Sequence, residues 1–227
     1  MTEKPTILVA GASRGIGREF VRQFGEAGWR VHATARDEKG RAQIEADGAI
    51  PHELEIRSDA SIEALKAELE GVPLDAVIAN AGITGNIALP PEDVRYDDML
   101  DVIDTNTISA LLLVVALKPN LLAGRRRLAL GMSSLMSSIS ANDWGTQYSY
   151  RASKTALNAT WRSLAAQWRG EGITCALLRP GFVKTDMTEF QGMDVGVSVA
   201  GMVGVVDRMT LCDTGRVIGY DGKDVPW

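Results

Sequence analysis

The chain has 227 residues, with 24 Lys and Arg against 29 Asp and Glu, a formal net charge of −5. This acidic balance argues against a nucleic-acid scaffold or a membrane-surface protein, because both partners are anionic. We expect no membrane span, since no apolar run reaches the roughly 18 residues that cross a bilayer. Cys175 and Cys212 have no metal-ligand spacing. We therefore expect one soluble, cytoplasmic domain over residues 1–227, without metal, nucleic-acid or membrane partners.

Short apolar runs alternate with amphipathic stretches through most of the chain. In chain order, the spacing predicts strands at 6–10, 30–35, 50–56, 74–79, 127–132, 173–178 and 216–220. It predicts helices at 15–27, 61–70, 96–117 and 148–168, and a polar helix that ends near Gly48. Strands that alternate with helices imply right-handed crossovers and a parallel sheet. The sequence thus predicts an α/β fold, a Rossmann-type doubly wound parallel sheet of about seven strands with helices on both faces.

Residues 181–213 depart from this alternation. Apolar residues keep helical spacing between 195 and 209, but Gly196, Gly201 and Gly204 interrupt them. Each glycine costs about 1 kcal/mol relative to Ala inside a helix. We expect a mobile substrate loop or helical lid at about 184–213.

A glycine-rich segment, Gly11-Ala-Ser-Arg-Gly-Ile-Gly17, lies directly between the first strand and the first helix. Its glycines let the backbone turn sharply and approach a diphosphate, and the helix N-terminus supplies free N–H groups. The order of strand, turn and helix favours a dinucleotide site over a plain turn. We expect cofactor contacts from Gly11, Ser13, Arg14, Gly15, Ile16 and Gly17.

A second motif, Tyr150-Arg-Ala-Ser-Lys154, places a phenol and an ammonium four residues apart on a predicted helix. They share one helix face. A nearby ammonium favours the phenolate and lowers the pKa of a tyrosine, which can then exchange a proton with a carbonyl or alcohol oxygen. The alternative is a solvated helix face, but the glycine turn earlier in the chain favours catalysis by Tyr150 and Lys154.

Together these motifs resemble the short-chain dehydrogenase/reductase family over nearly the whole chain. The runs Tyr148–Asn158, Val183–Met187 and Tyr220–Trp227 are most similar to the C-factor and Sniffer-like carbonyl reductases. The resemblance implies that Lys154 also binds the nicotinamide ribose. It further implies a proton relay through Asn106, for which a helix kink or a side-chain cap is the alternative.

The resemblance also implies where the cofactor lies. In the family an acid at the end of the second strand selects NAD, and this position holds Ala35, followed by Arg36. Two guanidiniums, Arg14 and Arg36, suit a 2′-phosphate, which predicts NADP(H); two solvated arginines are the alternative. Asp37 is expected to cap the next helix instead. By resemblance, the remaining cofactor contacts are Glu55, Ile56, Asn80, Ala81, Gly82, Pro180, Gly181, Val183 and Thr185.

A serine is expected to polarise the substrate oxygen beside Tyr150. The family's S-S-x-x-G pattern selects Ser134, whereas the common spacing back from Tyr150 selects Ser137. The loop at 140–147 looks longer than usual, which favours Ser134 and keeps Ser137 in reserve.

We therefore expect an NADPH-dependent reductase of a small carbonyl or alcohol substrate, working as a homodimer or homotetramer through the fourth and fifth predicted helices. A dinucleotide-binding signalling protein of the C-factor type is the main alternative, and an epimerase or dehydratase is a weaker one. The substrate itself does not follow from the sequence. A fairly apolar pocket is expected from Ile83, Ile87, Leu89, Trp144, Phe190 and Met193.

Overall fold

The computed structural model describes residues 4–86 and 89–227. Within them, one seven-stranded sheet has the order β3-β2-β1-β4-β5-β6-β7, and all neighbouring strands run parallel. The chain moves from β1 outward to β3 and then returns to β4 beside β1, which confirms the predicted doubly wound α/β fold. The strands are β1 (Thr6–Ala10), β2 (Arg30–Ala35), β3 (Ile50–Glu53), β4 (Ala76–Ala79), β5 (Leu128–Met132), β6 (Thr174–Arg179) and β7 (Val217–Gly219).

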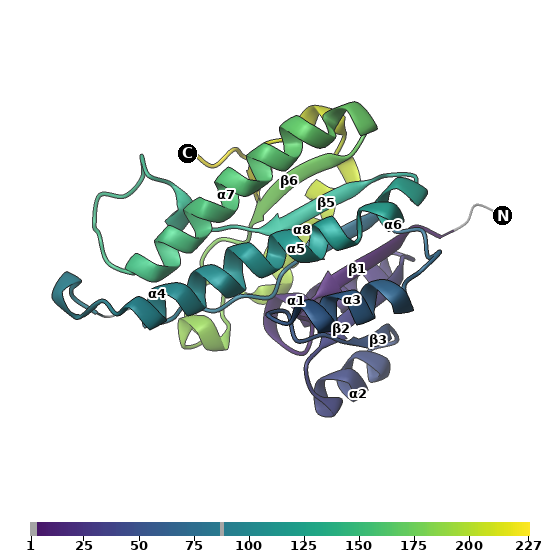
Figure 1. The fold of residues 1–227 in the computed structure, drawn as a ribbon, viewed down its shortest axis with the longest axis horizontal. Helices are drawn as coiled ribbons and strands as arrows, with labels where there is room; N and C mark the ends of the chain where they lie inside the picture. The colour runs from purple at the N-terminus through teal and green to yellow at the C-terminus, as the bar shows by residue number, and fades with distance from the viewer. Residues whose placement is uncertain (1–3, 87–88) are drawn as a thin grey trace.

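Helices cover both faces of the sheet (Figure 1). One apolar core lies between the sheet and helices α1, α2 and α8, and a second lies between the sheet and α3, α5, α6 and α7. Alternate residues of β1 point into opposite cores, as the pleat of a strand requires. The helices are α1 (Gly15–Glu26), α2 (Glu38–Ala46), α3 (Asp59–Glu68), α4 (Tyr96–Ile103), α5 (Ser109–Ala116), α6 (Lys118–Ala123), α7 (Tyr148–Trp168) and α8 (Val195–Arg208).

Several predicted elements differ from the structure by one or two residues at their ends, and two differ by more. The helix expected at 96–117 is interrupted by a π-helical turn, Asp104–Ile108, which separates α4 from α5. The third strand ends at Glu53 rather than at residue 56, because its partner strand β2 ends at Ala35, the residue opposite Glu53. Glu55 and Ile56 therefore lie in the loop that follows the strand.

The segment 96–116 is long and apolar enough to cross a membrane by composition, with a hydropathy of 1.6 over its 18-residue window. Our expectation that no such run exists is therefore wrong. In the structure 44% of that window is buried, and α4 and the π-turn pack against α7 (Figure 1). A helix inside a folded domain passes the same test, so this segment is explained by its place in the helical layer.

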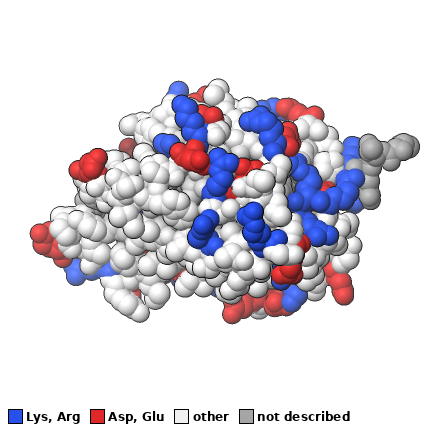
Figure 2. Space-filling model, turned by 90° about the horizontal axis from the view of Figure 1, so that it is seen from above, with Lys and Arg blue, Asp and Glu red and all other residues white. Residues whose placement is uncertain are grey.

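Charged side chains of both signs are mixed on the surface. Figure 2 shows one face on which Lys and Arg gather over one part, with Asp and Glu among and around them. Arg57, for example, contacts Asp101 and Asp104 at N–O distances of 2.9 Å each. Exposed pairs of this kind each contribute about 0–1 kcal/mol to stability. The surface charge therefore matters more for solubility than for the fold.

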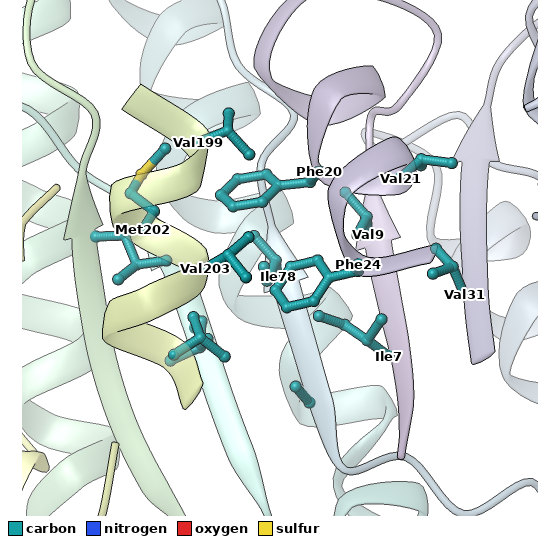
Figure 3. Packing of buried hydrophobic residues seen from close by; sticks show 14 of the residues in the cluster. Ile7, Val9, Phe20, Val21, Phe24, Val31, Ile78, Val199, Met202 and Val203 are labelled. Atoms are coloured by element: carbon teal, nitrogen blue, oxygen red, sulfur yellow. The ribbon is translucent and has the colours of Figure 1, made fainter. Parts of the chain in front are cut away.

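Helix α8 belongs to the core, although we predicted a mobile lid at about 184–213. Its Val199 and Met202 are 0% exposed and belong to the core that α8 shares with α1 and the sheet. Val199 lies beside Phe20 of α1 (Figure 3). Gly201 is needed for this packing, because a Cβ there would lie 2.3 Å from the carbonyl oxygen of Tyr220. Glycine is unfavourable inside a helix, but at this position its missing side chain lets α8 pack close to the chain after β7. Mobility of the preceding loop, residues 184–194, stays a prediction.

If α8 is a core helix, Met202→Ala should lower the free energy of unfolding by about 2–5 kcal/mol, because it opens a cavity. The matched control is Val197→Ala on the same helix, whose side chain is 59% exposed; we expect a change below about 0.5 kcal/mol. Urea unfolding of both variants measures the difference. Equal, small effects would show that α8 contributes little to the core.

Candidate functional site

The carboxyl ends of the strands surround a cavity of about 420 Å³. It lies where the strand order reverses between β1 and β4, the usual position of a ligand crevice in a doubly wound sheet. Most of the predicted site residues line it: Gly11, Ser13, Arg14, Gly15, Ile16, Gly17, Arg36, Glu55, Ile56, Asn80, Ala81, Gly82, Tyr150, Lys154, Pro180 and Thr185. The predicted residues Asn106, Ser134, Gly181 and Val183 are not among its walls.

The glycine turn forms one wall of this cavity. A Cβ on Gly17 would lie 2.1 Å from the carbonyl oxygen of Gly11, so α1 can begin this close to β1 only with glycine there. Asn80, the residue after the neighbouring strand β4, holds the turn in place, because its Nδ2 donates to the same Gly11 oxygen at 2.7 Å. Arg14 occupies the N-cap position of α1 without a side-chain cap hydrogen bond. The first N–H groups of α1 can therefore bind an anion.

Arg14 and Arg36 both line the cavity, but each has an acidic neighbour. Arg14 Nη1 lies 2.9 Å from Asp186 Oδ2, and Arg36 Nη1 lies 3.9 Å from Glu55 Oε2. The side chains of both arginines are 76% exposed, so these ion pairs are weak. Asp37 caps α2 as predicted, since its Oδ1 accepts from the Gly40 N–H at 2.7 Å.

Tyr150 and Lys154 share one face of α7, as their spacing predicted. Lys154 Nζ lies 5.7 Å from the centre of the Tyr150 ring and donates to the Met132 carbonyl at 2.8 Å. Lys154 is 5% exposed, and burial lowers the pKa of its ammonium to about 8. Burial also raises the pKa of Tyr150, against a smaller opposite effect of its hydrogen bond with Ser134. Our expectation of a lowered tyrosine pKa is therefore wrong for this structure, in which the phenol keeps its proton at neutral pH.

The two candidate serines have different surroundings. Ser134 hydrogen-bonds to the Tyr150 side chain. Ser137 is 2% exposed and lies in a buried polar network. Its hydroxyl donates to the Ser134 carbonyl at 2.6 Å and accepts from Asn158 Nδ2 at 2.9 Å and from Ser133 Oγ at 3.1 Å. Of the two hydroxyls, that of Ser134 is next to the phenol.

Asn106 lies within the π-helical turn rather than in the middle of a regular helix. Its Oδ1 accepts from the Ile83 N–H at 2.8 Å, and its Nδ2 donates to the Ile83 carbonyl at 2.8 Å and to Ser153 Oγ at 3.0 Å. The amide thus joins the loop after β4 to α7, one residue before Lys154. A π-turn inside a helix is often found at functional sites.

The segment after β6 reaches the cavity through Pro180 and Thr185. Thr185 lies against the glycine turn, since its Cγ2 would be 3.6 Å from a Cβ on Gly15. Val183 is 3% exposed and pairs with Met193 in an isolated bridge, and Gly181 packs against Tyr220. These two residues therefore shape the segment without lining the cavity.

Further residues line the cavity although they were not predicted to do so: Thr34, Ala35, Asp37, Leu54, Arg57, Thr105, Met132, Ser133, Asp186 and Met187. Most of them adjoin a predicted residue, so widening each motif by one or two positions finds them. The ion pair of Asp186 with Arg14 joins positions 172 apart in the sequence, and no local pattern predicts it.

Most of the six apolar residues that were expected to form a substrate pocket do not line this cavity. Ile83 lines it, whereas Leu89, Trp144, Phe190 and Met193 do not. Ile87 lies outside the described residues. Within the described part of the chain, no group of three or more His, Cys, Asp or Glu could hold a metal ion.

Comparison with known proteins agrees with this geometry. Residues 5–195 match the family model described as short chain dehydrogenase. C-signal of Myxococcus xanthus is 38% identical over 159 residues, which cover 68% of this chain and 93% of that protein. The structure of NADPH-bound carbonyl reductase from chicken fatty liver has a TM-score of 0.89 at 33% identity, covering 99% of this chain and 100% of that one. Carbonyl reductase Sniffer of D. melanogaster has a TM-score of 0.89 at 29% identity, with the same coverage. The chain therefore belongs to the short-chain dehydrogenase/reductase family and is of its carbonyl reductase and C-factor type.

Proposed function

We propose that this protein is an NADPH-dependent carbonyl reductase acting on a small substrate. The observation that carries the proposal is the meeting of Tyr150, Ser134 and Lys154 beside the cavity. A protonated phenol is hydrogen-bonded to a serine hydroxyl, and an ammonium lies 5.7 Å from the phenol ring. Pure dinucleotide binding does not need a proton donor in this position.

The walls of the cavity fit a nicotinamide dinucleotide with a 2′-phosphate. The glycine turn and the uncapped start of α1 suit the diphosphate. Arg14 and Arg36 would hold the 2′-phosphate, which favours NADP(H) over NAD(H). Glu55 and Ile56 are proposed to lie beside the adenine. The nicotinamide end would be held by Asn80, Ala81, Gly82, Pro180 and Thr185, together with Lys154, while Gly181 and Val183 shape the segment that carries Thr185.

When bound, NADPH supplies a hydride to the substrate carbonyl carbon. Tyr150 donates its proton to the carbonyl oxygen, which becomes the alcohol hydroxyl. Ser134 donates a hydrogen bond to the same oxygen and so fixes it beside the phenol. The Lys154 ammonium stabilises the phenolate that the proton transfer leaves behind. Asn106 orders the loop and helix around Lys154 and is proposed to continue the proton relay.

A signalling protein that binds the dinucleotide without turnover is the second candidate, and the similarity to C-signal favours it. The two functions differ in whether NADPH is consumed. Following NADPH absorbance with a panel of small aldehydes, ketones and quinones separates them.

We also propose a soluble, cytoplasmic homo-oligomer. A stripe of apolar side chains on α4, the π-turn and α5 is exposed in the single chain: Tyr96, Leu100, Ile108, Leu112 and Val115. Their spacing of three, four or eight residues gives one helix face. A second copy of this face would bury the stripe around a two-fold axis. Sedimentation velocity at micromolar concentration measures the oligomeric state directly.

Removing the phenol hydroxyl should abolish the reaction. We expect Tyr150→Phe to lower kcat by about 100-fold or more, because proton transfer in the transition state is lost, while NADPH affinity stays nearly the same. Ser134→Ala should also lower kcat. Tyr148→Phe, two residues away at a 41% exposed residue, is the matched control and should keep full activity. Full activity in Tyr150→Phe would contradict the mechanism.

Ser137→Ala separates the two serine assignments in the same assay. Its hydroxyl holds Ser133 and Asn158 together, so we expect a lower free energy of unfolding with kcat reduced less than in Ser134→Ala. The reverse order of kcat values would assign the polarising hydroxyl to Ser137.

The Lys154 ammonium should titrate near pH 8 in the free protein. Burial disfavours its charged form, so the charge is present below a pKa of about 8 and is lost above it. The ¹³Cε shift of labelled lysine, assigned by its loss in Lys154→Met, measures the midpoint by NMR. A midpoint above about 10, the ordinary value for lysine, would contradict the burial seen here.

The 2′-phosphate assignment can be tested by ligand binding alone. We expect Arg14→Ala and Arg36→Ala each to weaken binding of 2′,5′-ADP by about 10-fold, since each removes a charge-assisted contact, with little effect on 5′-AMP. Arg169→Ala removes the same charge at an exposed position far along the chain and should change neither affinity. Asp186→Asn should strengthen 2′,5′-ADP binding, because Asp186 competes for Arg14. Calorimetric titration measures all of these, and equal losses for both nucleotides would contradict the assignment.

A further inference from the structure

Arg151, the residue after Tyr150 on α7, is buried in an unusual way. Its side chain is 8% exposed, and burial lowers the pKa of the guanidinium. Within the described residues, Nη1 and Nη2 are buried without a hydrogen-bond partner. A buried cation is unfavourable unless its contacts compensate, so the contacts that Arg151 does make need an explanation.

Those contacts all go to the loop that leads into α7. Arg151 Nε donates to the carbonyl oxygens of Gly145 at 3.2 Å and Thr146 at 3.1 Å. The guanidinium lies 4.6 Å from the centre of the Trp144 ring. The side chain is thus held between two carbonyls and one aromatic face, all from residues 144–146.

The same loop carries backbone strain. Gly145, Thr146 and Gln147 have φ values of +69°, +63° and +55°, three left-handed residues in a row. This conformation is unfavourable for a β-branched residue such as Thr146. Gln147 is the N-cap residue of α7 but makes no side-chain cap hydrogen bond. The start of α7 is therefore not stabilised by an ordinary cap. Arg151 holds the loop from the first turn of the helix, and Ser149 hydrogen-bonds to Asp98 of α4.

The loop is part of the chain that joins Ser134 to Tyr150, the two groups proposed to act on the substrate oxygen. Ser134 lies just before the 3-10 turn Leu135–Ser137, and Tyr150 lies in the first turn of α7. The position of one hydroxyl relative to the other depends on how the intervening chain is held.

We propose that Arg151 is a positioning residue, which clamps the left-handed turn 145–147 onto α7 and so keeps the Tyr150 phenol in register with Ser134. A guanidinium is suited to this task because its Nε–H faces two carbonyls while its plane stacks on an aromatic ring. A lysine has the charge but lacks both the Nε–H and the planar group. The proposal rests on the proposed catalytic role of Tyr150.

The first test is Arg151→Lys, with Arg162→Lys on the same helix as its matched control. We expect the first variant to lower kcat about 10-fold or more with an unchanged KM for NADPH, and the control to keep wild-type kcat. The inactive Tyr150→Phe variant, measured alongside, establishes that the reaction uses the phenol. Wild-type kcat in Arg151→Lys would overturn the clamp while leaving the proposed function intact.

The second test is rescue by removal of the strain. In Thr146→Gly the left-handed conformation is unstrained, so the clamp matters less. Arg151→Lys in that background should recover kcat several-fold, and an undiminished loss in the double variant would overturn the proposal. Cleavage by proteinase K in the loop 139–147 gives a readout without turnover. We expect faster cleavage in Arg151→Lys and slower cleavage again in the double variant, whereas equal rates in all variants would also overturn the proposal.

Discussion

The burial of one ammonium group constrains the whole site. Lys154 extends from α7 to the carbonyl of the last residue of β5, with a carbonyl oxygen rather than a carboxylate as its acceptor. A buried cation of this kind is unfavourable for folding, and the fold keeps it through the packing of α7 on the sheet. Trp161 donates from Nε1 to the Ala129 carbonyl at 3.1 Å, which fixes the helix on the strand. The Tyr150 phenol, four residues before Lys154 on the same helix, is placed by the same packing.

The fold and the cofactor end of the site follow from the sequence because their signals are local. A glycine turn between a strand and a helix needs no distant partner to be interpreted, and neither does a tyrosine four residues before a lysine. The strand pattern predicts the sheet for the same reason, since buried parallel strands are short apolar runs. The resemblance to a family then added residues, such as Glu55 and Asn80, that no pattern identifies alone.

The remaining features depend on contacts between distant segments. The glycines of α8 suggest a lid in the sequence, whereas Gly201 brings the helix against Tyr220. Counting residues could not separate Ser134 from Ser137, because the choice depends on how the chain turns after β5. The pKa of Tyr150 moves opposite to the expectation, because spacing predicts a charged neighbour but not the loss of water around a group.

One side chain of the π-turn has a wider consequence. Asn106 binds both the N–H and the carbonyl of Ile83, so its amide pairs with the loop after β4 much as a neighbouring strand would. That loop includes Gly82 and Ile83, which form part of the cavity wall. Order imposed by folding lowers the entropy lost when a ligand docks. This side of the crevice is thus shaped in advance, and an occupant meets a rigid wall rather than a segment that must first be organised.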